Sequence, residues 1–262
     1  MALIFSAMRL IKTPAKSGYV WFRQGIWLFS KSPLTFLTIF FTYFVSMLLV
    51  THLPIVGSML WLILVPSLFV GFMSICRDVI AGHHVLPLAL FTSFRVHRSD
   101  VIRQLFKLGL IYLGLITASL SIMSLIHGGS LIKTIVSELK PNNDVSTSGI
   151  FLSHIAMGLI IHVPTMMLFW FAPLLTAWHR VPPIKAMFFS VVACWYNRSA
   201  FLVYLATWFM LVIAVSLMLG FVLNACGLTN GVLTVLLPVS IILWAMIYCS
   251  FYATYRGCFT IE

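Results

Sequence analysis

Three short motifs in the sequence combine a basic residue with a serine, and such a combination can bind phosphate. The motifs are Ser30-Lys31-Ser32, His97-Arg98-Ser99 and Asn197-Arg198-Ser199, and each lies directly before a long apolar segment. A serine at this position can cap a helix, and a capped helix N-terminus attracts anions. Lys or Arg at headgroup depth adds a charged donor. The candidate ligands for lipid phosphate are therefore Lys31, Ser32, Arg98, Ser99, Arg198 and Ser199. The alternative explanation is that these cations only anchor the helices at the membrane surface and contact nearby lipid without specificity.

Acid–base catalysis has few residues to work with in this chain. All five acidic residues fall outside the long apolar segments, so paired carboxylates and an intramembrane proton relay are not predicted. No phosphate-binding P-loop, HExxH or GxSxG motif is present. We therefore expect a protein that is not an enzyme.

Histidine is the other residue type that could carry chemistry here. His162 lies near the middle of the predicted fourth span, two residues before Pro164. An ionisable side chain at that depth is costly and is a candidate functional residue, although a neutral imidazole bonded to backbone freed by the proline explains it as well. His52, His127 and His154 are predicted near the external face of the membrane, but their spacing matches no metal-binding motif. We expect no metal and no cofactor, with a metal or haem site at these histidines as the alternative.

The composition decides which elements must position these residues. The chain has 262 residues, of which 61% are hydrophobic and 8% are charged, whereas soluble domains carry about a quarter charged residues. An apolar stretch of roughly 20 residues crosses a bilayer as a helix. We predict an all-α polytopic membrane protein, with residues 1–262 forming a single transmembrane domain. Its six spans are expected at about 34–53, 58–76, 101–126, 150–178, 200–223 and 232–255.

The cations indicate how the spans are oriented. Lys and Arg concentrate near both termini and between spans two and three and spans four and five, and only Lys133 and Lys140 fall on the opposite side. The positive-inside rule places both termini in the cytoplasm. The net charge of +11 comes without a dense basic run, so we expect anionic headgroups on the cytoplasmic side as partners, and no nucleic acid. The scattered cysteines are expected to be free thiols.

Short amphipathic segments precede the odd-numbered spans and are predicted to lie on the cytoplasmic surface. They cover residues 18–29, 86–94 and 184–195, and a further surface helix is possible within 128–149. The apolar faces expected to meet the membrane are Tyr19, Phe22, Ile26 and Phe29 in the first segment and Ile184, Met187, Phe188, Val191 and Trp195 in the third.

The three basic motifs and the prolines together indicate an internal repeat. Pro66, Pro164, Pro173 and Pro238 all fall within even-numbered spans. We therefore predict three parallel copies of one unit: surface helix, straight span, turn and broken span, related by rotation about the membrane normal. Chance recurrence of short polar motifs at helix entrances is the alternative.

Several longer motifs are spread over nearly the whole chain. They are Pro66-Ser-Leu-x-x-Gly-Phe-Met, Phe169-Trp-Phe-Ala-Pro, Ala177-Trp-His, Pro182-Pro-x-Lys-Ala, Phe188-Phe-Ser, Asn197-x-x-Ala-Phe and Ser250-Phe-Tyr-Ala-x-Tyr-Arg. These motifs resemble an uncharacterised family of six-helix proteobacterial inner-membrane proteins. The layout is also remotely similar to the membrane domain of bacterial glycerophosphodiester phosphodiesterases. Gln24 and Gly257 depart from the closer family, in which an acid and an Asp are expected, so an ion pair common there is absent.

The resemblance implies a location in the bacterial inner membrane but no activity. Two functions remain. The first is a non-enzymatic membrane protein that binds lipid or partner membrane proteins in the envelope, and the second is a small-molecule or lipid transporter or channel built on the broken helices. A continuous polar cavity between the even-numbered spans would favour transport, whereas a dry, packed centre would favour binding.

Overall fold

The computed structural model describes residues 8–54, 56–83, 85–91, 99–126, 158–159, 162–225, 227 and 232–261. Most of these residues are helical, and five of the described helices are long and apolar enough to cross a membrane. The prediction of an all-α polytopic membrane protein is confirmed at this level. The five helices are α2 (Pro33–Thr51), α3 (Val56–Ile80), α5 (Ser99–Ile126), α10 (Arg198–Ala225) and α11 (Val232–Cys258).

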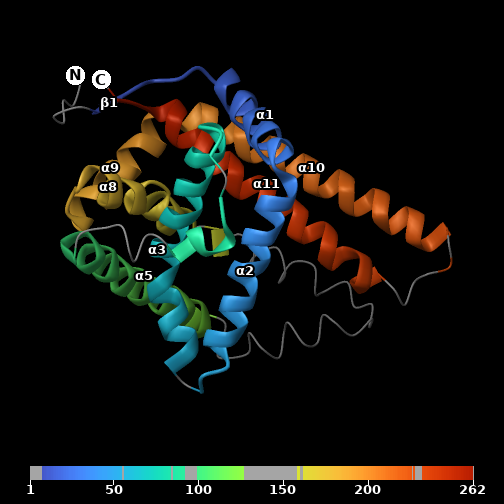
Figure 1. Cartoon of the computed structure of the whole chain (residues 1–262), viewed down its shortest axis with the longest axis horizontal. Coiled ribbons are helices and arrows are strands. Elements are labelled where there is room, and N and C mark those ends of the chain that lie inside the picture. The colour runs from blue at the N-terminus through green and yellow to red at the C-terminus, as the bar shows by residue number, and fades with distance from the viewer. Residues whose placement is uncertain are drawn as a thin grey trace.

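Shorter elements gather at the end of the bundle that carries both termini, which we call the terminal end (Figure 1). They are α1 (Lys16–Lys31), α8 (Ala172–His179) and α9 (Pro183–Tyr196). The 3-10 helix η1 (Pro87–Phe91) packs against α2 and α3. Strand β1 (Met8–Leu10) pairs antiparallel with β2 (Phe259–Ile261), so the two ends of the chain lie together. This strand pairing was not predicted, because two three-residue strands leave no periodic signal in the sequence.

The predicted fourth span is only partly described, and its described part is broken. Residues 162–169 are helical, Trp170 and Phe171 interrupt the helix, and α8 follows. At the break, the backbone N–H of Phe171 donates to Ser190 Oγ at 2.9 Å, and that hydroxyl donates to the Met167 carbonyl at 2.6 Å. The Ser190 side chain therefore stands where a direct i to i−4 helix bond would form. Helix α9 is joined to the broken span at this point.

Helix α1 packs into the bundle through small residues. An added Cβ at Gly18 would collide with the carbonyl oxygen of Ala200 on α10, and one at Gly25 would collide with Ser250 on α11. Between these contacts Trp21 is buried. The inward face thus follows the glycines and also includes part of the predicted membrane-facing side, because Phe29 is buried and Phe22 packs on Trp208 with ring centroids 4.9 Å apart. Tyr19 stays exposed, so the prediction that this whole side meets the membrane is wrong. Backbones approach this closely only where side chains are small.

Helix α9 shows the same arrangement. Its buried residues are small, and include Ala186, Ser190 and Ala193, while Ile184 and Phe188 of the predicted apolar face are exposed. The large apolar face therefore points away from the bundle, which is compatible with membrane contact.

A single buried asparagine fixes the N-terminal segment. Asn197, fully buried between α9 and α10, accepts hydrogen bonds from the backbone N–H and the hydroxyl of Thr13 at 2.8 and 3.0 Å. Its amide N–H donates to the carbonyls of Ile11 and Ala193 at 3.0 and 3.2 Å. Ile11 N–H also donates to the Cys258 carbonyl at 2.9 Å. Because these bonds connect α9, α10, α11 and the N-terminal segment, Asn197 is a structural centre of the terminal end.

Candidate functional site

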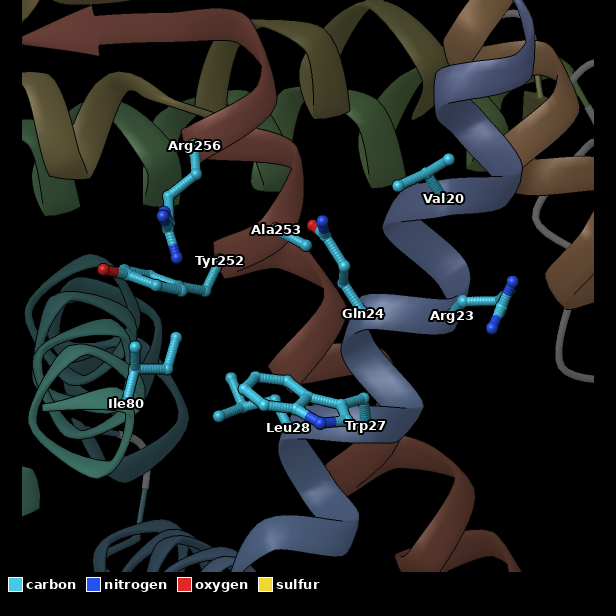
Figure 2. Close-up of a pocket in the computed structure, with 9 residues that line it drawn as sticks. All are labelled: Val20, Arg23, Gln24, Trp27, Leu28, Ile80, Tyr252, Ala253 and Arg256. Carbon is cyan, nitrogen blue, oxygen red and sulfur yellow. The ribbon is translucent and has the colours of Figure 1, made fainter. Parts of the chain in front are cut away.

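A cavity lies at the terminal end between α1, the end of α3 and α11 (Figure 2). It has a volume of about 410 Å³, which is in the range of small-ligand sites. Val20, Leu28 and Ile80 supply apolar wall. The polar groups come from Arg23 and Gln24 on α1 and from Tyr252 and Arg256 on α11. We call this cavity the basic pocket.

The polar side chains of the basic pocket occupy different edges of it. In Figure 2, Arg256 extends beside the ring of Tyr252, and Gln24 reaches from α1 toward Ala253. Arg23 extends on the other flank of α1, with its guanidinium turned away from Arg256. Guanidinium and phenol groups, together with the amide N–H₂, are hydrogen-bond donors. The pocket therefore offers donors from two sides, and no carboxylate lines it.

The surroundings of the basic pocket add further positive charge. Arg77 and Asp78, at the end of α3, lie within electrostatic range of Tyr252, as does Arg256. The Arg77 guanidinium is 3.4 Å from the Asp78 carboxylate, so this acid already has a cationic partner. Lys31 donates from its ammonium to the Ile80 carbonyl at 3.3 Å, next to the pocket wall. Among the described residues, no acid pairs with Arg23 or Arg256, and the local balance is positive.

An exposed tryptophan forms the rim of the basic pocket. Trp27 is 56% exposed, and the Lys31 ammonium lies over its ring at 5.6 Å from the centroid. An indole with a cation beside it is typical of the interface between headgroups and acyl chains. The rim therefore matches a ligand with an anionic head and an apolar tail.

A second cavity, of about 180 Å³, lies next to the broken span, against α3, α5 and α11. Its walls include Pro66 of α3, Tyr112 of α5, and His162 and Trp170 of the fourth span. His162, which the sequence predicts to be a polar residue within the membrane, lies in the wall of this cavity, and its side chain is exposed.

The neighbouring centre is filled with aromatic rings. Trp170 packs on Phe251 with ring centroids 4.8 Å apart, and Tyr248 packs on Phe72 and Phe40 at 5.2 and 5.8 Å. Within the described residues, the space between α3, the fourth span and α11 is therefore largely apolar.

The structure separates the predicted phosphate ligands. Lys31 lies near the basic pocket, as described above, whereas Arg198 lies over the ring of Trp195, with 5.4 Å from its guanidinium carbon to the ring centroid. Ser32 occupies the predicted N-cap position of α2 but makes no capping hydrogen bond through its side chain. Ser99 is the first residue of α5, and Arg98 lies outside the described residues.

The predicted capping role of Ser199 is wrong. Helix α10 begins at Arg198, which places the exposed Ser199 inside the helix. The junction is held by the neighbouring Asn197, whose side chain bonds to other segments instead of to the start of α10. Phosphate binding at the six predicted residues stays a prediction.

The remaining candidates for chemistry are placed as follows. His52 Nδ1 lies 2.8 Å from the Leu48 carbonyl in its own helix, while His127 and His154 lie outside the described residues, so a metal or haem site there is untested. The described cysteines, Cys76, Cys194, Cys249 and Cys258, are free and buried. On α9, burial raises the pKa of the Cys194 thiol. A protonated, buried thiol is a poor nucleophile.

Sequence reasoning missed most of the basic pocket. Arg256 and Tyr252 fall at the end of the last span, and Gln24 was noted only as a departure from a family pattern. The signal that could have found them is the set of cations in the N-terminal segment together with Arg256 near the C-terminus, once the termini are known to meet.

Comparison with known proteins gives one strong relative. The chain is 48% identical over 258 residues to a probable inner membrane protein of Burkholderia thailandensis, and the match covers 97% of this chain and 95% of the relative. No family model and no solved structure matches the chain, so the remote likeness to the membrane domain of glycerophosphodiester phosphodiesterases stays a prediction. Together with the apolar helices, the match supports a multi-pass location in the inner membrane. The chain belongs to the same family as this probable inner membrane protein.

Proposed function

We propose that this inner-membrane protein is not an enzyme and binds the anionic headgroup of a phospholipid in the basic pocket. The observation that carries the proposal is the lining itself: Arg23 and Arg256 lie at opposite edges of a cavity of about 410 Å³ that has apolar walls and no carboxylate. A phosphate diester can accept charge-assisted hydrogen bonds from guanidinium groups. The acyl chains would leave past Trp27 toward the bilayer.

The absence of an acid at Gln24 supports the same ligand. The resembled family is expected to carry an acid here, which would neutralise a neighbouring arginine. In this chain, an amide takes that place in the pocket wall. Gly257 is the other position that differs from the resembled family. An added Cβ at Gly257 would collide with the Trp21 indole, so an Asp would not fit at this position. The pocket therefore keeps its positive charge for an external anion.

The proposed orientation puts the basic pocket in the cytoplasmic leaflet. The described lysines and arginines lie in the segments and helix ends at the terminal end of the bundle. The positive-inside rule assigns such an end to the cytoplasm, where anionic lipids attract cations. Reporter fusions at Gln24 and Asn142 are expected to read cytoplasmic and external, and the reverse reading would contradict this orientation.

A threefold repeat is also proposed, because equivalent elements make equivalent contacts in cyclic order. Each surface segment packs on the even-numbered span of the preceding unit, if the three units are taken as a ring in which the third unit precedes the first. Thus η1 packs on α3, α9 packs on α8, and α1 packs on α11. Two of these contacts use a glycine, since a Cβ at Gly71 would meet Leu90 of η1 and one at Gly25 would meet Ser250 of α11. Superposition of the three units by rotation about one axis would test the repeat, and failure of η1 to overlay α1 and α9 would remove it.

Transport is the second candidate function, and the cavity next to His162 favours it. Pro66 and Pro173 line the same cavity, and prolines leave backbone groups unpaired that can face a substrate path. The aromatic contacts of Trp170 and Tyr248 fill the adjacent described centre. Binding is preferred because a centre packed with aromatic rings, as described here, does not offer a continuous polar path.

The test is the lipid content of protein purified in mild detergent from its own membranes. Wild type is expected to retain acidic phospholipid above its bulk fraction, chemically intact, as measured by mass spectrometry of the extract. Arg23→Gln/Arg256→Gln should lower this retention by about tenfold or more, because each lost charged hydrogen bond contributes about 1.5–3 kcal/mol. Lys185→Gln removes an exposed charge outside the pocket and is the matched control. Equal retention in all three proteins would refute the proposal.

A further inference from the structure

We propose a second lipid site, at the junction of α5 and α8, that takes a phospholipid headgroup bearing a primary ammonium. A cavity of about 140 Å³ lies there, lined by Asp100, Val101, Gln104, Thr176 and Arg180. Because none of these residues lines the basic pocket, the proposal does not depend on the anionic-lipid site.

The first observation is a pair of buried polar atoms without partners. Gln104 Oε1 and Thr176 Oγ1 both lie out of solvent, and neither has a hydrogen-bond partner among the described residues. Thr176 is only 1% exposed, and both residues line the same cavity. Buried polar atoms are nearly always bonded, and an amide oxygen can only accept. The cavity therefore calls for a ligand that donates N–H or O–H.

The second observation is the arrangement of charge around the cavity. Arg180 supplies a guanidinium from the end of α8, and Asp100 supplies a carboxylate from the first turn of α5. Arg103 donates to that carboxylate at 3.2 Å. Arg180 is also the only described residue other than glycine with positive φ, at φ 54° and ψ 29°. Such a conformation is unfavourable for a side chain-bearing residue, and glycine is usual at this helix end.

The ligand class follows from combining these groups. A bare cation would be repelled by Arg180 and Arg103, and a simple anion would leave Gln104 Oε1 without a donor. A single headgroup that carries both a phosphate and an ammonium would match all of these groups. Its phosphate would bond to Arg180, and its ammonium would donate to Asp100, Gln104 Oε1 and Thr176 Oγ1. A quaternary ammonium has no N–H and cannot do this. The cavity has room for a headgroup but not for acyl chains, which would extend into the bilayer.

The test is native mass spectrometry of delipidated protein mixed with phosphatidylethanolamine, phosphatidylcholine and phosphatidylglycerol of the same chains. Wild type should retain phosphatidylethanolamine about tenfold more than phosphatidylcholine, because charged hydrogen bonds distinguish the headgroups. Phosphatidylglycerol, which the basic pocket is also proposed to bind, is compared in the Arg23→Gln/Arg256→Gln protein, where phosphatidylethanolamine should be retained more strongly. Gln104→Leu and Thr176→Val should reduce phosphatidylethanolamine to the phosphatidylcholine level. Both variants remove an unpaired polar atom, so their thermal unfolding without lipid should match or exceed that of wild type.

Two controls make the result decisive. Thr117→Val removes a hydroxyl that bonds within α5, to the Leu113 carbonyl, and should leave lipid preference unchanged. Arg23→Gln/Arg256→Gln should keep the phosphatidylethanolamine preference, which separates this site from the basic pocket. Equal retention of phosphatidylethanolamine and phosphatidylcholine would overturn the proposal, as would stronger retention of phosphatidylglycerol in the Arg23→Gln/Arg256→Gln protein. Unchanged binding in Gln104→Leu and Thr176→Val would also overturn it, since water alone would then occupy the cavity.

Discussion

Replacing Ser190 by alanine should loosen the attachment of α9 to the broken fourth span. The Ser190 hydroxyl accepts from Phe171 N–H at 2.9 Å and donates to the Met167 carbonyl at 2.6 Å, and the side chain is fully buried. Alanine keeps the small volume that α9 needs but removes both bonds. The Phe171 N–H and the Met167 carbonyl would then have no partner, unless they form a direct hydrogen bond with each other.

The size of the effect follows from these two groups. A buried polar group left unpaired costs about 1–3 kcal/mol, so two groups bound the loss at about 2–6 kcal/mol. Direct re-formation of the Phe171 to Met167 bond would recover part of it, and we expect a net loss of about 2–3 kcal/mol. For a chain of this size, that corresponds to a decrease of roughly 5–10 °C in the unfolding temperature.

Thermal unfolding in detergent, followed by intrinsic fluorescence, would measure the decrease. Ser74→Ala is the matched control, because the Ser74 hydroxyl bonds only to the Val70 carbonyl in its own helix, and it should shift unfolding by less than about 2 °C. An unfolding temperature for Ser190→Ala equal to that of Ser74→Ala would refute the view that Ser190 holds the break open.

Four further predictions concern single side chains. Gly257→Ala should destabilise the fold by about 1–3 kcal/mol, because the new Cβ collides with the buried Trp21 indole, and an unchanged unfolding temperature would contradict this contact. Burial lowers the pKa of His179, whose ring nitrogen lies 2.6 Å from the Tyr255 hydroxyl. As pH drops, the His179 imidazole therefore binds a proton in the unfolded state at a higher pH than in the folded state. Stability should fall as pH drops below about 6.5, and His179→Gln should make stability less dependent on pH in this range. Gln24→Glu should reduce retention of anionic lipid at constant fold, whereas retention equal to wild type would count against the basic pocket. Arg198→Lys should lose a co-purifying anionic lipid if its motif binds phosphate specifically, and full retention would leave plain anchoring.

The membrane helices were predictable because their signal is local. A long apolar run is enough to identify a span, and the described helices begin and end within a few residues of the predicted bounds. The prolines were a weaker sign: Pro173 lies in the first turn of α8, directly after the described break, but α3 and α11 continue as helices through Pro66 and Pro238, so the predicted break in those two spans is wrong. The whole of the fourth span and the segment 128–149 cannot be compared, because they lie wholly or partly outside the described residues.

The contacts that hold the terminal end together were not predictable in the same way. Asn197 bonds to Thr13, and Ser190 bonds across to Met167, so each acts on residues far away in sequence. Neither residue differs locally from an ordinary polar residue at a helix end or on a surface helix. The glycines of α1 were a usable sign: Gly18 and Gly25 are seven residues apart and lie on one face, where helices can approach closely.

The central claim is that an anionic phospholipid occupies the basic pocket, and crosslinking at its rim tests it most directly. A photoreactive phenylalanine analogue would replace Trp27, which lines the pocket, with Tyr19 as the control position, exposed on α1 and outside the lining. After illumination of native membranes, mass spectrometry of the purified protein would identify the attached lipid. The account predicts that acidic phospholipid is enriched at position 27 over position 19, and that Arg23→Gln/Arg256→Gln abolishes the enrichment. Adducts with bulk lipid composition at both positions would contradict it.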